Sequence, residues 1–146
     1  LSKDDTTKSE AQTFLRDTSR AKWLMTLTRI AYQPSGLDKI IHNRGTGESY
    51  EEQVDFITPD EKIIDTSNPA SYQTLLGTQD NIQEINNVFQ WLNGTDAYAW
   101  KVNSKPKSIE ERVARFYADS GWAVLYCDWD PSNSSSSLGV RLRKKI

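Results

Sequence analysis

The chain has 146 residues and a formal net charge of −2, which suits one globular domain and points to no particular class of partner. One cysteine, Cys127, and one histidine, His42, cannot supply an intrachain disulfide or the ligands of a Cys/His zinc site. The lone cysteine fits a reducing compartment, so we expect a cytoplasmic location, and no apolar run approaches the roughly 18 residues that cross a bilayer.

The first predicted element is a helix that begins near Ser9. Ser9 and Gln12 have the spacing of a capping box, in which each side chain binds a free backbone N–H at the helix start. Pro34 ends the helix, because proline cannot continue the hydrogen-bond ladder. The residues that recur at three- to four-residue spacing on its expected buried face are Phe14, Ala21, Leu24, Thr28 and Ala31.

Three extended segments follow, at residues 37–43, 49–58 and 61–66. The glycines of HNRGTGES, which joins the first two, raise the question of a phosphate-binding loop. Such a loop needs glycine where this chain has His42 and lysine where it has Glu48. The stretch therefore predicts the turn of a β-hairpin, in which glycines supply positive φ angles.

Residues 67–80 are interpreted as a linker. A second helix is predicted from Ile82 to the Asn-Gly pair at residues 93–94, which is a good helix stop. Trp91 lies roughly opposite the apolar face of this helix. A bulky aromatic side chain at that position either packs against a second layer or is presented to a partner.

The last third of the chain begins with a strand at residues 96–102. A third helix is then predicted, starting from a capping box of Ser108 and Glu111. Residues 122–130 are apolar on both alternating faces, which is typical of a strand near the centre of a sheet. The final segment, residues 138–146, alternates as a strand and is expected to form an antiparallel hairpin with residues 122–130.

These elements predict one α+β domain over residues 1–146, with about three helices packed on a mostly antiparallel sheet. The expected order of elements is α-βββ-α-β-α-ββ.

No cofactor motif and no nucleophile motif is present, so we expect no cofactor, no metal and no catalytic residue. His42 is expected on the surface beside a turn. Asp128 and Asp130 lie two residues apart at the end of a strand and would point to one side. With a third carboxylate they would suit a divalent metal, so a carboxylate-dependent hydrolase or nuclease is kept as a second alternative.

Basic and aromatic residues are interleaved in the last third of the chain. Tyr98, Trp100, Trp122 and Trp129 alternate along the sequence with lysines and arginines. Charge that follows phosphates beside rings that stack on bases is the pattern of single-stranded nucleic-acid binding. The alternative function is therefore nucleic-acid or anion binding through the basic residues of the last predicted strand, namely Arg141, Arg143, Lys144 and Lys145.

Charge is distributed unevenly along the chain. The net charges of residues 1–47, 48–100 and 101–146 are +3, −9 and +4. An acidic middle between basic ends favours association with a second copy or with a protein partner. The leading hypothesis is a non-enzymatic binding or assembly module that uses these charges and the surface aromatics Trp91 and Trp100.

Overall fold

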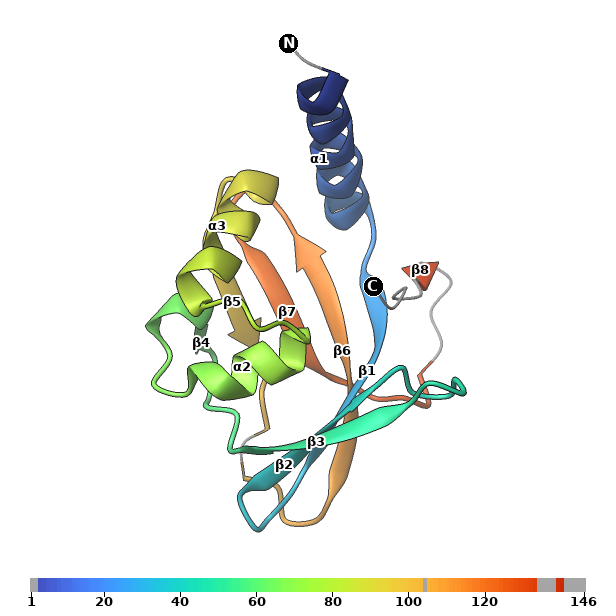
Figure 1. Cartoon of the computed structure of the whole chain (residues 1–146). Coiled ribbons are helices and arrows are strands. Elements are labelled where there is room, and N and C mark those ends of the chain that lie inside the picture. Colours follow the sequence, from blue (N-terminus) through green and yellow to red (C-terminus); the bar gives the residue numbers. More distant parts are fainter. Residues whose placement is uncertain (1–2, 104, 134–138, 141–146) are drawn as a thin grey trace.

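A computed structural model describes residues 3–103, 105–133 and 139–140 (Figure 1). The helices are α1 (Lys3–Ala21), α2 (Pro69–Leu76) and α3 (Ile82–Asn93), with a short 3-10 turn, η1 (Ile63–Asp65). The strands are β1 (Leu24–Tyr32), β2 (Leu37–His42), β3 (Tyr50–Asp55), β4 (Glu61–Lys62), β5 (Ala97–Trp100), β6 (Glu110–Ala118), β7 (Ala123–Trp129) and β8 (Gly139–Val140).

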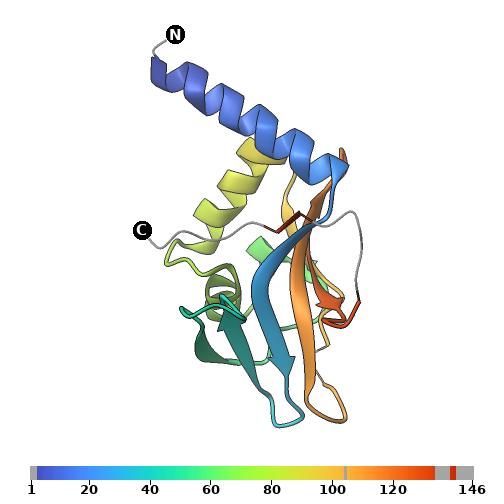
Figure 2. The same cartoon turned by 90° about the vertical axis from the view of Figure 1, so that its right-hand side faces the viewer.

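The strands form one curled, mixed sheet in the order β3-β2-β1-β6-β7-β5-β4, with β8 beside the start of β1. Most neighbours are antiparallel, whereas the β5–β7 and β1–β8 pairs are parallel. Helices α2 and α3 lie on the concave face of the sheet, and α1 extends beyond it (Figures 1 and 2). The predicted α+β class, with three helices and a mostly antiparallel sheet, is confirmed.

The hydrophobic core lies between the concave face and helices α2 and α3. Its side chains include Ile30 and Tyr32 from β1, Tyr72 from α2 and Cys127 from β7. The Tyr32 hydroxyl donates a 3.0 Å hydrogen bond to the Cys127 carbonyl oxygen, which satisfies the one polar atom of a buried ring. Burial also raises the pKa of the Cys127 thiol, so this cysteine is an unreactive core residue.

The first predicted helix is too long. Helix α1 ends at Ala21, and residues 24–32 form strand β1 instead of a continued helix. Leucine and isoleucine recur there at helical spacing, but Thr26, Thr28 and Ile30 are β-branched and favour a strand. Pairing with β2 on one side and β6 on the other decides the outcome. Ser9 lies inside α1, so it caps nothing.

The third predicted helix is wrong, because residues 110–118 form strand β6. Val113 and Phe116 would share one face of a helix, but in the strand they point to opposite sides of the sheet. Glu111 and Arg115 have the spacing of an ion pair along a helix, whereas each forms ion pairs with other elements. Residues 110–118 pair with both β1 and β7, and this two-sided pairing outweighs the local helical pattern.

The predicted linker at residues 67–80 contains α2, which is only eight residues long. Its limits follow ordinary helix signals. Asn68 caps the start and accepts a hydrogen bond from the Ser71 N–H, Pro69 occupies the first turn, and Gly77 ends the helix in a left-handed conformation with φ of 66°.

Several predictions in the rest of the chain are confirmed. The glycine-rich stretch is the β2–β3 hairpin turn, and Asn43 and Gly45 supply its positive φ angles. Helix α3 runs from Ile82 to the expected Asn-Gly stop, and β7 has a strand on each side. The predicted hairpin between residues 122–130 and 138–146 is wrong, because β7 pairs with β5 and β6, while β8 pairs with β1.

Helix α1 is held to the end of α3 by its polar side chains. Arg16 Nε donates to the Leu92 carbonyl oxygen at 2.8 Å, and Arg20 donates to the backbone and side-chain oxygens of Asn93 at 3.2 and 2.9 Å. These contacts place positive charge on the free carbonyls of a helix C-terminus. Among the described residues, no helix is both long and apolar enough to cross a membrane.

Candidate functional site

Side chains alternate between the two faces of the sheet along β5, β6 and β7, and this alternation shows which of them lie on the convex face. Ala99, Ala114 and Leu125 point into the core under the helices. Their neighbours along each strand therefore point to the opposite side. The residues placed there by this alternation and by strand register are Tyr98, Trp100, Arg115, Tyr117, Val124 and Tyr126.

Aromatic side chains from distant parts of the chain meet on this convex side. Trp23 stacks on Tyr117 with ring centroids 4.6 Å apart and meets Tyr126 edge-on at 4.9 Å, and Trp100 meets Trp122 at 5.4 Å. Val124 is completely buried in the same area, so the rings form a continuous cover over the strands. We call this surface the aromatic face. Its seven residues are all half-buried: Trp23, Tyr98, Trp100, Tyr117, Trp122, Tyr126 and Trp129.

Arg115 lies among these rings and is only 8% exposed. The centre of its guanidinium group is 4.0 Å from the ring centroid of Trp23 and 4.1 Å from that of Trp129, which are close cation–π distances. Burial lowers the pKa of Arg115, but a guanidinium group remains charged at neutral pH. Arg115 is therefore a buried positive charge that packs against aromatic rings.

One carboxylate, Asp128, balances two cations beside the rings. Its oxygens lie 3.8 Å from Arg115 and 3.7 Å from Lys101. Three buried polar atoms of this cluster make no hydrogen bond: Arg115 Nε, Asp128 Oδ1 and Trp129 Nε1. Lys101 has a positive φ of 55°, which is uncommon for a residue with a side chain.

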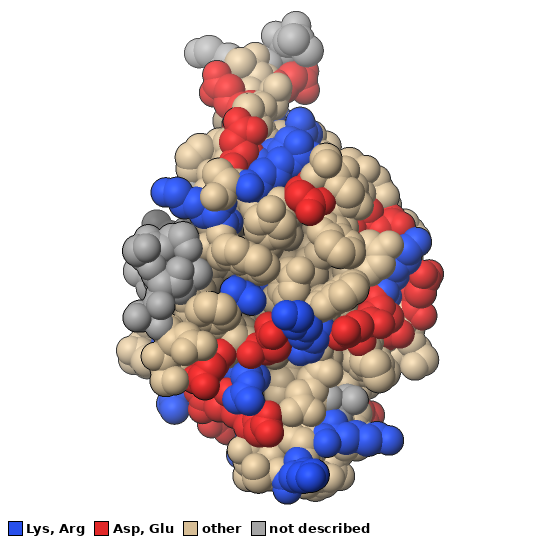
Figure 3. Space-filling model, turned by 180° about the vertical axis from the view of Figure 1, so that it is seen from behind, with Lys and Arg blue, Asp and Glu red and all other residues tan. Residues whose placement is uncertain are grey.

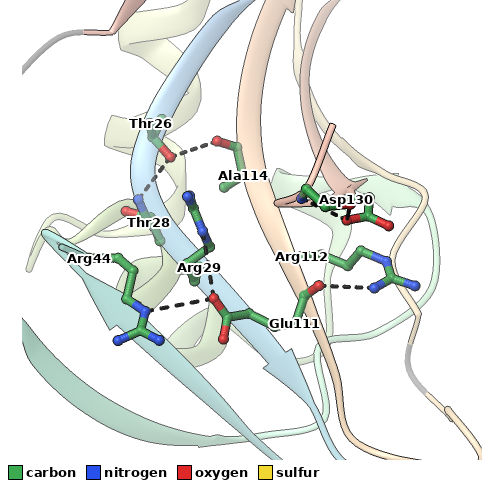
Figure 4. A network of polar contacts seen from close by, with 9 residues as sticks. Thr26, Thr28, Arg29, Arg44, Glu111, Arg112, Ala114 and Asp130 are labelled. Atoms are coloured by element: carbon green, nitrogen blue, oxygen red, sulfur yellow. Dashed lines mark hydrogen bonds and ion pairs between the residues drawn. The ribbon is translucent and has the colours of Figure 1, made fainter. Parts of the chain in front are cut away.

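A second group of charges lies on β1 and β6 of the same sheet (Figure 4). Glu111 is 3.6 Å from Arg29 and 3.7 Å from Arg44, so again one carboxylate serves two cations. Beside it, the Thr26 hydroxyl donates a 2.6 Å hydrogen bond to the Ala114 carbonyl oxygen, where the register of β1 against β6 shifts. Seen from the side opposite α2 and α3, basic and acidic groups alternate between uncharged areas (Figure 3).

The two tryptophans predicted at the site, Trp91 and Trp100, do not come together. Trp91 is 46% exposed on α3, whereas Trp100 belongs to the aromatic face on the other side of the sheet. The predicted nucleic-acid or anion-binding residues, Arg141, Arg143, Lys144 and Lys145, lie outside the described residues. The structure thus joins Trp100 to a larger cluster and leaves Trp91 on a separate surface.

The prediction for His42 is wrong, because this side chain is buried and not on the surface. Its Nε2 lies 2.8 Å from the Thr74 carbonyl oxygen and therefore donates to it. Its Nδ1 lies 3.0 Å from the Thr28 hydroxyl, which donates in turn. His42 thus joins α2 to β1 and β2 and has a structural role.

The two aspartates considered for a metal site have separate partners. Asp128 faces the cations Arg115 and Lys101, while Asp130 accepts hydrogen bonds of 2.8 and 2.7 Å from the backbone and hydroxyl of Ser132. Within the described parts of the chain, no group of three or more metal-binding side chains occurs. No observation in this region favours the hydrolase alternative.

Sequence reasoning missed three members of the aromatic face. Trp23 and Tyr117 fall in segments that were assigned to helices or their ends, and Tyr126 was treated only as part of a central strand. The available signal was the two-residue spacing of Arg115 and Tyr117, which places both side chains on one side of a strand. No protein-family model, no curated protein and no solved structure matches this chain.

Proposed function

We propose that this protein is a non-enzymatic binding module whose aromatic face docks a protein partner. One observation carries the proposal: seven half-buried aromatic residues gather on the side of the sheet that α2 and α3 leave open, and three of them pack against a buried arginine. A sheet face of this composition is unusual for a surface that meets only water.

The composition of the aromatic face is that of the centre of a protein interface. Tryptophan, tyrosine and arginine are the residues enriched among those that contribute most to binding energy. Here the rings already pack on one another, as in the Trp23–Tyr117 and Trp100–Trp122 contacts. Side chains that are ordered before binding lose little conformational entropy when a partner arrives.

The charges near the rings favour a protein over a nucleic acid. Arg115 and Lys101 share Asp128, and Lys62 lies 3.2 Å from Asp96. A carboxylate beside each cation repels phosphate and reduces the gain from releasing counterions. The mixed charges instead suit hydrogen bonds and ion pairs at the rim of a protein interface.

Site-specific photo-crosslinking in the native cell extract tests the proposal. A benzophenone amino acid replaces Tyr98 or Tyr126 on the aromatic face, and Ile109, which is 67% exposed before β6, serves as the control position. We expect the same protein adduct from both face positions and none from the control. Excess unlabelled protein should suppress the adduct, and the additional substitution Trp100→Ala should remove it.

Equal adducts at all three positions, or none at either face position, would contradict the proposal. A nucleic-acid partner has a separate signature, measured by fluorescence anisotropy with labelled oligonucleotides at ~50 and ~200 mM salt. Binding with a steep salt dependence that Trp100→Ala abolishes would replace the protein partner with a single-stranded nucleic acid. We expect no such binding.

A further inference from the structure

Strand β3 is an open edge of the sheet. Among the described residues it is the first strand in the sheet order and pairs with β2 alone, in an unbroken register from Leu37 opposite Asp55 to His42 opposite Tyr50. Edge strands are usually protected by charged side chains, above all lysine, or by proline, a bulge, a covering helix or very short length. β3 has six residues, no lysine, no proline and no bulge, and its charged side chains, Glu51, Glu52 and Asp55, are all acidic. Its outer edge is therefore able to pair with another extended chain.

Helix α2 lies beside this edge (Figures 1 and 2), and its Ser71 hydroxyl donates a 3.2 Å hydrogen bond to the Asp55 carbonyl oxygen at the end of β3. We call the space between α2 and β3 the groove. Two depressions of about 270 and 360 Å³ follow the edge and share Ala70 and Thr74 of α2 as lining residues. On the strand side, one is lined by Tyr50 and Glu52, and the other by Val54. Small side chains on α2 thus leave room for the side chains of an added strand.

The groove is acidic. Its lining includes Glu52 and Asp55 but no lysine or arginine. Within the described residues, neither carboxylate forms an ion pair, whereas Glu51 lies 3.4 Å from Lys39. Two β3 edges would repel each other if they paired, because like charges would be brought together. The negative charge of the groove therefore favours binding of a basic strand.

We propose that residues 141–146 of a second copy add to β3 as an extra strand in this groove. Four of the six residues of this segment, RLRKKI, are basic. In an extended chain, Leu142, Lys144 and Ile146 fall on one side, so the two apolar side chains can enter the two depressions with Lys144 between them near Glu52. The arginines then lie on the other side, where Asp55 points. This surface is separate from the aromatic face, so each proposal can fail without the other.

The partner must be a second copy because the geometry forbids the same pairing within one chain. Val140 lies opposite Met25, on the side of β1 that β2 occupies farther along. The position beyond β3 is about two strand spacings, ~10 Å, from there. One peptide unit advances the chain by about 3.8 Å, so Arg141 cannot begin a six-residue pairing with its own β3. Each copy instead offers one edge and one segment, which generates head-to-tail chains.

A labelled RLRKKI peptide tests the contact directly. In anisotropy titrations of the dilute full chain, we expect saturable binding that weakens about tenfold with Glu52→Lys or Asp55→Lys. The matched control Glu48→Lys makes the same charge change in the hairpin turn and should bind normally. A scrambled peptide of the same composition that binds equally well would overturn the proposal, because only charge would then matter.

Backbone methylation separates strand addition from other modes of binding. A strand pairs through alternate backbone N–H groups. One peptide is therefore N-methylated at Leu142 and Lys144 and a second at Arg141 and Arg143, and the two modifications should have opposite effects on binding. One modified peptide should lose binding and the other should keep it. Equal binding by both would exclude an added strand.

Mixing two variants tests the second copy. Glu52→Lys damages the groove but leaves the segment intact, whereas Arg143→Glu damages the segment but leaves the groove intact. Analytical ultracentrifugation at low salt should show chains of increasing length for the unmodified protein and monomers for each variant alone. An equimolar mixture should form a complex that stops at two copies. An unmodified protein that stays monomeric at high concentration and low salt would overturn the proposal.

Discussion

Arg115 and Lys101 share one carboxylate, Asp128, but differ in burial, and this difference predicts unequal effects on stability. The Arg115 side chain is 10% exposed and that of Lys101 is 53% exposed. Arg115→Met removes a buried cation and its close cation–π contacts with Trp23 and Trp129, so it should lower the free energy of unfolding by about 2 kcal/mol. Lys101→Met should cost less than about 1 kcal/mol, as exposed pairs do. Urea unfolding of the two variants measures both values, and equal losses would contradict the assigned role of Arg115.

Asp96 makes stability depend on pH at the acid end. Hydrogen bonds from Asn86 and Gln90, with a further contribution from Lys62, lower the pKa of Asp96 from 3.8 to about 2. A lowered folded-state pKa contributes stability that is present above the unfolded pKa and is lost as the pH falls from 3.8 to about 2. Asp96→Asn should therefore show a smaller change in thermal midpoint across this interval than the unmodified chain. Identical pH profiles would show that Asp96 does not contribute.

At the scale of elements, the two arginines of α1 should decide whether this helix stays docked. Isolated helices of this length are marginal in water, and α1 is exposed along most of its surface. Arg16→Met combined with Arg20→Met removes the hydrogen bonds to the end of α3 and should weaken docking by about 2 kcal/mol. Hydrogen exchange of the α1 amides should then accelerate more than tenfold. Lys8→Met on the same helix is the control and should leave exchange unchanged.

Elements marked by local caps and stop residues were predictable from the sequence. Elements whose residues combine helical spacing with strand propensity were not. Helix α3 has a capping box of Asn81 and Glu84 and a glycine stop, all within one local stretch. Residues 24–32 and 110–118 carry helical spacing and strand propensity together. Their strand form depends on backbone partners far away in the sequence, which a local window does not contain. The short helix α2 has a helix-start signal in Pro69 and a helix-stop signal in Gly77. With only eight residues, however, it is too short to show a clear helical repeat of apolar residues.

At the scale of the whole molecule, the aromatic face and the core are built on the same strands, so they should unfold together. Four of the five tryptophans belong to the aromatic face, so tryptophan fluorescence reports on that side of the sheet. Far-ultraviolet circular dichroism reports on the helices and strands as a whole. We expect the two unfolding curves in urea to coincide, as in a two-state transition. Separate midpoints would show that the two faces unfold independently.

The sequence by itself determined the α+β class, the β2–β3 hairpin, α3 and the apolar strand β7, because turn residues, caps and burial patterns act within a few residues. It also placed Trp100 and the basic segment at residues 141–146 among the candidates for binding. Only the tertiary structure decided that β1 and β6 are strands, because their partners are distant. That decision brings Trp23 beside Tyr117 and Tyr126, so the aromatic face exists only once the sheet has formed. The groove beside β3 likewise exists only in the folded chain, because it lies between α2 and β3, which are separate segments.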